Sequence, residues 1–125
     1  MKRIILGLSL LLMLVQNGFS SEFCSQENIN QNIAGQWENS NSYYYIFKIK
    51  NNKLCISVKD DYSNTKRDVN KIEIKNGKLK LFSIHTPSTN ALVVYKDINL
   101  VKENKLSYNW SSPYGSGYNV LIKTK

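Results

Sequence analysis

The stretch SYYYIFKIKNNKLCISVKD, residues 42–60, decides the fold of this chain. Along Ser42–Lys50 every second side chain belongs to the same face of an extended strand, because the side chains of a strand alternate in direction. Asn51-Asn52 predicts a tight turn, since asparagine tolerates positive φ. Lys53–Asp60 then alternates again. The stretch therefore predicts an antiparallel hairpin whose second strand has an apolar face of Leu54, Ile56 and Val58, with Cys55 on the other face.

The same period of two continues outward from this hairpin and predicts six further strands. Asn76-Gly77 is the strongest two-residue hairpin signal in the chain. We expect Leu79 and Leu81 to share one face of the strand that follows it. In a later and longer strand we expect Leu92, Val94, Ile98 and Leu100 to be in phase. The six strands are Gln36–Asn39, Arg67–Lys75, Lys78–Ile84, Thr89–Val101, Lys105–Ser111 and Tyr118–Thr124.

These patterns predict an all-β protein in which eight antiparallel strands form a meander. An open sheet of this length would leave exposed edges, and closing the sheet removes them. Eight strands close into a barrel whose interior is just wide enough for side chains or one small ligand. An open β-sandwich is the alternative architecture. We expect the barrel domain to span residues 35–125 and an N-terminal arm or short helical turn to span residues 21–34.

Residues 1–20 have the features of a secretory signal peptide, which is removed from the mature protein. Lys2 and Arg3 precede an apolar run from Ile4 to Val15, which is too short to span a membrane. Removing this segment, with two basic and no acidic residues, leaves 105 of 125 residues and lowers the net charge from +8 to +6. We therefore expect an exported protein, periplasmic or extracellular, without a transmembrane segment in its mature form.

Export to an oxidising compartment favours a disulfide between the only two cysteines, Cys24 and Cys55. Such a bond would close a loop of about 32 residues and stabilise the fold by about 3–4 kcal/mol. It would also attach the mature N-terminus to the body of the domain. Two free thiols are the alternative, and a metal pair is disfavoured because the single histidine, His85, has no ligand partner near it in the sequence.

The positive charge comes from lysines that alternate with apolar residues along the whole chain, as on the solvated face of amphipathic strands. This pattern is typical of solubility and protected edges, and binding to an anionic envelope partner is the alternative. Arg67 is the only arginine after residue 20. Because bidentate phosphate recognition relies on arginine, we expect no nucleic-acid partner.

Two groups of residues resemble a known family. Gly35-Gln36-Trp37 before the first barrel strand is similar to the Gly-x-Trp signature of lipocalins. The order of a strand, x-Gly, x-Leu-x-Phe and x-Pro-Ser-Thr resembles small bacterial lipocalin-like domains. This resemblance implies a barrel over about residues 34–122 in which Trp37 closes one end. The second group consists of Val69–Lys75, Asn76-Gly77, Leu79-Lys80-Leu81-Phe82 and Thr86-Pro87-Ser88-Thr89.

The tyrosine run Tyr43-Tyr44-Tyr45 makes both faces of its strand aromatic, so one face must lie inside. A buried tyrosine needs a partner for its hydroxyl group. The inward tyrosines therefore either line a semi-polar cavity or belong to an ordinary core with hydroxyls at its rim. If a cavity exists, we expect it to be lined by Tyr45, Phe47, Ile56, Leu81 and Val94.

A second aromatic group, Trp110, Tyr114 and Tyr118, lies near the last hairpin among serines and glycines, where it could stack on a sugar, clasp a partner or simply belong to the turn. No nucleophile, phosphate-binding or zinc motif is present. We therefore assign no catalytic residue, no metal ligand and no cofactor. The sequence favours a non-enzymatic protein that binds a small apolar or amphipathic ligand in the barrel mouth. The alternative is an envelope or extracellular protein-interaction module, such as an inhibitor or an adhesion accessory.

Overall fold

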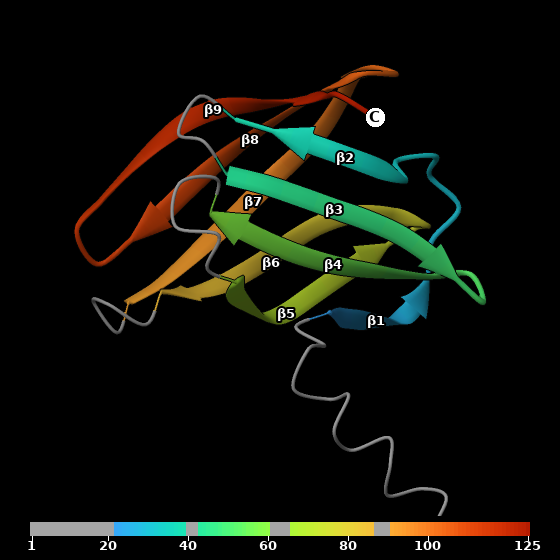
Figure 1. Cartoon of the computed structure of the whole chain (residues 1–125), viewed down its shortest axis with the longest axis horizontal. Helices are drawn as coiled ribbons and strands as arrows, with labels where there is room; N and C mark the ends of the chain where they lie inside the picture. Colours follow the sequence, from blue (N-terminus) through green and yellow to red (C-terminus); the bar gives the residue numbers. More distant parts are fainter. Residues whose placement is uncertain (1–21, 40–42, 61–65, 87–90) are drawn as a thin grey trace, which may run out of the picture.

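The computed structural model describes residues 22–39, 43–60, 66–86 and 91–125, which contain nine β-strands (Figure 1). The expected signal peptide, residues 1–20, lies outside the described residues. Within the part that is described, no helix is long and apolar enough to cross a membrane. The strands are β1 (Phe23–Asn28), β2 (Gly35–Glu38), β3 (Tyr43–Lys50), β4 (Lys53–Asp60), β5 (Lys66–Lys75), β6 (Lys78–Thr86), β7 (Ala91–Lys102), β8 (Lys105–Ser112) and β9 (Gly115–Lys123).

Eight of these strands, β2 to β9, form a closed antiparallel barrel. Neighbours pair in the order β4-β3-β2-β9-β8-β7-β6-β5, and β5 pairs again with β4 to complete the circle. The β2–β9 pairing brings the two ends of the barrel sequence together, with Trp37 opposite Lys123. The prediction of a closed eight-stranded barrel is confirmed, and the open sandwich is wrong.

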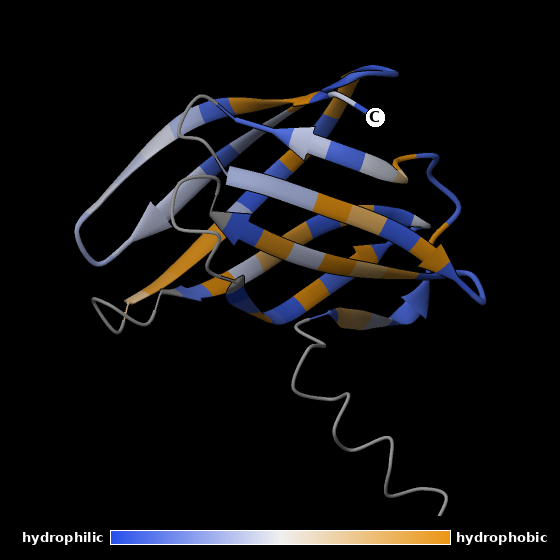
Figure 2. Ribbon diagram, viewed as in Figure 1, coloured by the Kyte–Doolittle hydropathy of each residue, from blue (hydrophilic) through white to orange (hydrophobic). Residues whose placement is uncertain are grey.

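Both predicted two-residue hairpins are present, and each turn uses residues that accept positive φ. Asn51 and Asn52 have φ values of 51° and 66° between β3 and β4. Asn76 and Gly77 have φ values of 55° and 77° between β5 and β6. Two consecutive residues with positive φ give the turn a twist that matches the strands beside it. Figure 2 shows the resulting alternation of apolar and polar residues along the strands.

The barrel interior is a packed aromatic and aliphatic core. Trp37, Tyr45 and Phe47 are buried to 1% exposure or less. The rings of Phe82 and Tyr95 stack in parallel with their centroids 4.5 Å apart, and the ring of Tyr45 meets both edge-on. Aromatic pairs in these arrangements add to the stabilisation from burial alone. The side chains therefore fill most of the space that closure encloses.

Bulges in β6 and β7 change which side chains face the core from what the sequence pattern predicts. On β6 the register shifts so that Glu73 faces Leu81 and Ile74 faces Leu79. Leu79 and Phe82 are buried while Leu81 is only half-buried, so Leu79 and Leu81 do not share the inner face. A bulge inserts one extra residue and turns every later side chain to the other face.

On β7 the inward residues are Ala91, Tyr95 and, beyond a bulge, Ile98. Leu92 is 39% exposed, and Val94 is half-buried on the same outward side. The predicted inner face of β7 is therefore wrong for the residues before the bulge and correct for the residues after it. The physical reason is that Asp97 has a φ of 53° where the β7–β8 register shifts.

The N-terminal segment, expected to be an arm or short helical turn, contains strand β1, which pairs with one end of β4. Cys24 lies opposite Cys55, and their sulfurs form the predicted disulfide. The hydroxyl of Ser25 accepts a hydrogen bond from the Leu54 amide at 3.1 Å. β4 pairs with β5 only at its other end, through Val58 and Lys59. β1 therefore occupies the β4 edge that β5 leaves unpaired.

Candidate functional site

One end of the barrel is closed by the segment that links β1 to β2. The backbone amides of Ile29 and Asn30 donate to the carbonyls of Asn52 and Gly77, so the segment is attached to both hairpin turns at 2.8 Å each. Two side chains of the segment itself, Ile29 and Ile33, are buried in the core. The indole Nε1 of Trp37 donates to the Ile33 carbonyl at 3.0 Å. Trp37 and the linking segment together close this end, and we call the opposite end of the barrel the mouth.

The five side chains expected to line a cavity do not line the mouth. Tyr45, Phe47 and Ile56 belong to the buried core cluster, where they pack against neighbouring side chains. Leu81 and Val94 are half-buried and lie outside that cluster. The interior that Tyr45, Phe47 and Ile56 occupy is filled, because aromatic rings from several strands meet across the barrel.

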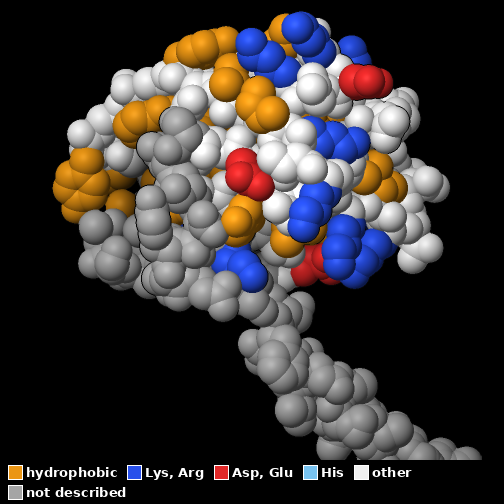
Figure 3. Space-filling model, turned by 45° about the horizontal axis from the view of Figure 1, so that its top comes forward, with side chains coloured by type: hydrophobic (Ala, Val, Ile, Leu, Met, Phe, Trp, Pro, Cys, Tyr) orange, Lys and Arg blue, Asp and Glu red, His pale blue; other side chains and the backbone are white. Residues whose placement is uncertain are grey.

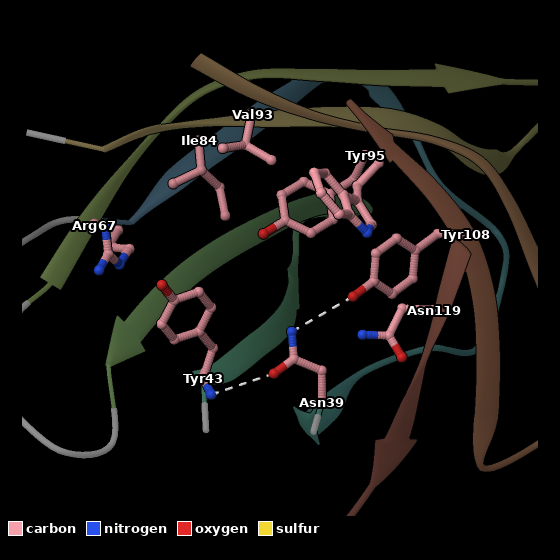
Figure 4. A pocket seen from close by; sticks show the side chains of 9 residues that line it. Asn39, Tyr43, Arg67, Ile84, Val93, Tyr95, Tyr108 and Asn119 are labelled. Atoms are coloured by element: carbon pink, nitrogen blue, oxygen red, sulfur yellow. Dashed lines mark hydrogen bonds between the residues drawn. The ribbon is translucent and has the colours of Figure 1, made fainter. Parts of the chain in front are cut away.

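At the mouth, the described residues enclose a pocket of about 140 Å³ (Figure 4). Its lining combines apolar side chains with hydroxyl, amide and guanidinium groups from β2, β3 and β5 to β9 or the residues next to them. A cavity of about 150 Å³ can hold a group the size of a benzene ring. The lining residues are Asn39, Tyr43, Arg67, Ile84, Val93, Tyr95, Tyr108, Trp110 and Asn119.

A hydrogen-bond network joins polar residues that line this pocket to the buried Tyr45. The hydroxyls of Tyr45 and Tyr95 share a hydrogen bond at 3.0 Å. The Asn39 amide donates to the Tyr45 hydroxyl at 2.9 Å and to the Tyr108 hydroxyl at 3.4 Å, while its oxygen accepts from the Tyr43 backbone amide at 3.4 Å. Asn39 therefore gives the hydroxyls of Tyr45 and Tyr108 the partner that buried hydroxyls require, and it also holds the backbone of Tyr43.

Arg67 supplies the positive charge at the pocket wall. Its guanidinium carbon lies 4.8 Å from the centre of the Tyr43 ring, within the range of a cation–π contact. Arginine is the residue best suited to such a place, because its planar group stacks on a ring and still presents several N–H donors. No carboxylate, histidine, cysteine or serine side chain is among the described residues that line the pocket. The lining thus offers hydrogen-bond donors and a fixed positive charge.

Burial raises the pKa of three of these tyrosines above the ordinary value of 10.0. Loss of hydration is the main cause for Tyr45, Tyr95 and Tyr108. For Tyr45 the neighbouring Tyr95 and Tyr108 add to the upward shift of the pKa. All three hydroxyls therefore keep their protons at neutral pH and act as neutral donors and acceptors.

We expect the ionisation of Tyr45, Tyr95 and Tyr108 to lag behind that of the unfolded chain as the pH rises above 10. Because their folded pKa values are raised, the folded state retains protons that the unfolded state releases. The associated stability is complete below pH 10 and declines as the pH rises through the folded values. Tyrosinate absorbance during an alkaline titration, with and without denaturant, measures this lag. If all eight tyrosines of the folded protein ionised together with those of the unfolded chain, the network would not be buried as described.

A second feature is an open groove of about 640 Å³ at the closed end, beside β3 and the end of β9. Its apolar floor includes Ile46 and Ile49, and four lysines surround it: Lys48, Lys50, Lys123 and Lys125. Lys50 pairs with Glu22 at 2.7 Å, and among the described residues the other three form no ion pair. Figure 3 shows basic and hydrophobic side chains interspersed on the face over β2, β3 and β9. We call this groove, with its four lysines, the lysine groove.

Only one described cluster brings together side chains of metal-ligating type: Glu22, Cys24 and Cys55. The two sulfurs of this cluster are bonded to each other in the disulfide. A disulfide sulfur is not the thiolate that metals bind, so the oxidised protein has a single carboxylate there.

Comparison of the chain with protein-family models, curated proteins and solved structures finds no match. The resemblance carried by Gly35-Gln36-Trp37 therefore remains a proposal, and the function must be argued from the pocket.

Sequence reasoning missed most of the mouth pocket. The tyrosine run Tyr43-Tyr44-Tyr45 indicated a semi-polar cavity, and of these three residues only Tyr43 is among those that line the pocket. Asn39 and Asn119 lie among many other asparagines, which hides them. Arg67 did carry a signal, since it is the only arginine after residue 20 in a chain that otherwise uses lysine.

Proposed function

We propose that this protein is an exported, non-enzymatic, lipocalin-like binding protein that holds one end of a small amphipathic ligand in the mouth pocket. The observation that carries the proposal is a pocket of about 140 Å³ that combines apolar walls with fixed polar groups at one end of a filled barrel. Ligand sites typically have this combination of apolar surface and a few placed polar groups. The apolar leader and the disulfide support export.

The dimensions restrict the ligand. Sites for drug-sized molecules usually enclose about 300–1,000 Å³, and this pocket is smaller. It fits a single ring or a short apolar group, with the rest of the molecule outside the mouth. Ile84, Val93 and Trp110 provide apolar contact, while Arg67 favours an acidic or acceptor group on the ligand. The proposed ligand is therefore a small ring-containing or short-chain molecule with a negatively charged substituent.

The test begins with native mass spectrometry of the protein purified from its own host, followed by extraction of any carried molecule. We expect a bound small molecule, and we expect Arg67→Gln to weaken its affinity about ten- to a hundredfold, as loss of a charge-assisted hydrogen bond does. Lys71→Gln is the matched control, because Lys71 is exposed on the same strand and lies outside the pocket.

Equal affinity of the Arg67→Gln and Lys71→Gln variants would contradict the assigned role of Arg67. A Val93→Trp variant gives a second readout, since the larger side chain would occupy the pocket. Retention of the ligand by a folded Val93→Trp protein would place the binding site elsewhere.

The lysine groove favours a second candidate function, a protein-interaction module that docks an acidic face of a partner protein. Complementary charge steers such an encounter and makes it sensitive to salt. We expect Lys48→Gln/Lys123→Gln to elute from a cation-exchange resin at lower salt than Lys78→Gln/Lys80→Gln, which removes the same charge from β6. Identical elution of the two variants would mean that the charge is spread evenly and that the groove has no concentrated field.

A further inference from the structure

The outer surface of β7, β8 and β9 carries a shallow groove of about 460 Å³. It lies on the opposite side of these strands from the core, because Leu106 and Tyr108 of β8 point inward while Asn109 and Ser111 alternate with them. Only Trp110 lines both this groove and the mouth pocket. The groove is therefore a separate feature that the proposed ligand pocket does not use.

Strand register places the polar groups of the groove in two parallel rows. Lys96 of β7 lies opposite Asn109 of β8, which in turn lies opposite Tyr118 of β9. One step along the strands, Ser111 lies opposite Ser116. Directly opposed residues of antiparallel strands point to the same face, with their Cβ atoms about 4.5–5.5 Å apart. A hydroxyl pair thus stands beside an amide and an aromatic ring.

Asp97 is held in position by an uncommon backbone conformation and a hydrogen bond. Its φ of 53° is in the left-handed region, where residues other than glycine are uncommon and often mark functional sites. The Asn109 amide nitrogen donates to its Oδ2 atom at 2.9 Å. This bond uses one carboxylate oxygen of Asp97. The other carboxylate oxygen and the side-chain Oδ1 atom of Asn109 are available to accept hydrogen bonds.

The aromatic element is Tyr118, which is 67% exposed. Its neighbour Gly117 has no side chain, and a Cβ atom there would lie 2.9 Å from Nε1 of Trp110. The indole therefore packs directly on the backbone beside Tyr118. This contact ties the position of the exposed ring to a residue that packs against the core.

We propose that this groove binds a neutral carbohydrate. A sugar ring has an apolar C–H face that matches the exposed Tyr118 ring, and its edge carries hydroxyls that both donate and accept. Asp97 and Asn109 match the donors, and the serine hydroxyls match either role. Lys96 and Asp97 cancel in charge, so this groove gives no advantage to a polyanion.

The experiment measures binding of the whole protein, at physiological salt, to an array of neutral oligosaccharides built from glucose, galactose, mannose or N-acetylglucosamine. We expect the protein to bind at least one of them. Tyr118→Ala should lower that affinity at least tenfold. Asp97→Asn should lower it severalfold, because asparagine also accepts the left-handed conformation but carries no charge.

Tyr114→Ala is the matched control. Tyr114 is 77% exposed in the β8–β9 turn, near the groove but outside its lining, and Figure 3 shows hydrophobic side chains protruding at the left edge where this hairpin ends. We expect Tyr114→Ala to bind like the unchanged protein. Failure to bind any neutral oligosaccharide would overturn the proposal, as would equal losses in Tyr114→Ala and Tyr118→Ala. Both substitutions are at exposed positions, so circular dichroism should show an unchanged fold.

Discussion

Replacing Trp37 with alanine is expected to lower the free energy of unfolding by about 3–5 kcal/mol, the usual cost of removing a large aromatic side chain from a core. Trp37 is fully buried, packs 6.1 Å from the Phe47 ring between centroids, and lies where β2 joins β9 to close the barrel. Its loss would also leave the Ile33 carbonyl without the indole donor. Since small domains are stable by about 5–15 kcal/mol, this single change removes a large share of the total.

Urea unfolding followed by far-ultraviolet circular dichroism measures the effect. Trp37→Phe is the milder variant, because phenylalanine keeps part of the packing while the indole donor is lost. We expect this variant to lose less stability than Trp37→Ala, by at least 1 kcal/mol. A Trp37→Ala protein within about 1 kcal/mol of the unchanged protein would show that Trp37 does not hold this end of the barrel closed.

Removing the disulfide by Cys24→Ala/Cys55→Ala is expected to lower stability by about 3–4 kcal/mol, from the loop-closure entropy that the bond removes from the unfolded chain. The bond joins residues separated by 31 positions and attaches exposed Cys24 to buried Cys55. Without it, β1 is held to β4 by strand pairing and by the Ser25–Leu54 hydrogen bond. We therefore also expect faster amide hydrogen exchange in β1 and at the paired end of β4.

Chemical denaturation measures the global effect, and hydrogen exchange measures the local one. The chemically reduced protein is the control for cavity effects, since it lacks the bond but keeps both sulfurs; it should unfold at nearly the same denaturant concentration as the double variant. An unchanged midpoint in both samples would mean that the cross-link adds nothing to the stability of the barrel.

The strands were predictable where local chemistry decides them. Asn51-Asn52 and Asn76-Gly77 specify their hairpins because few residue types accept two successive positive φ values. Alternation then assigned the correct inner face to β4, where Leu54, Ile56 and Val58 are all buried. In these segments the turn and the pattern agree, and nothing distant overrides them.

The sequence pattern predicted the wrong inward-facing residues where a bulge interrupts a strand. The shift near Lys80 separates Leu79 from Leu81, and the left-handed Asp97 separates the two halves of β7. A bulge reflects how a strand bends around the closed barrel, so period-two counting does not detect it. The expected cavity residues Leu81 and Val94 follow from that counting, which explains why they lie outside the core cluster.

The sequence by itself determined the all-β class, the two asparagine-containing hairpins and the cysteine pair, because each depends on side-chain period, local φ preference or cysteine number. Only the tertiary structure decided that the linking segment after β1 covers one end, that the barrel centre is solid, and that Asn39, Tyr43 and Arg67 meet at the other end. These outcomes depend on how side chains distant in sequence share one enclosed volume, which no local pattern specifies.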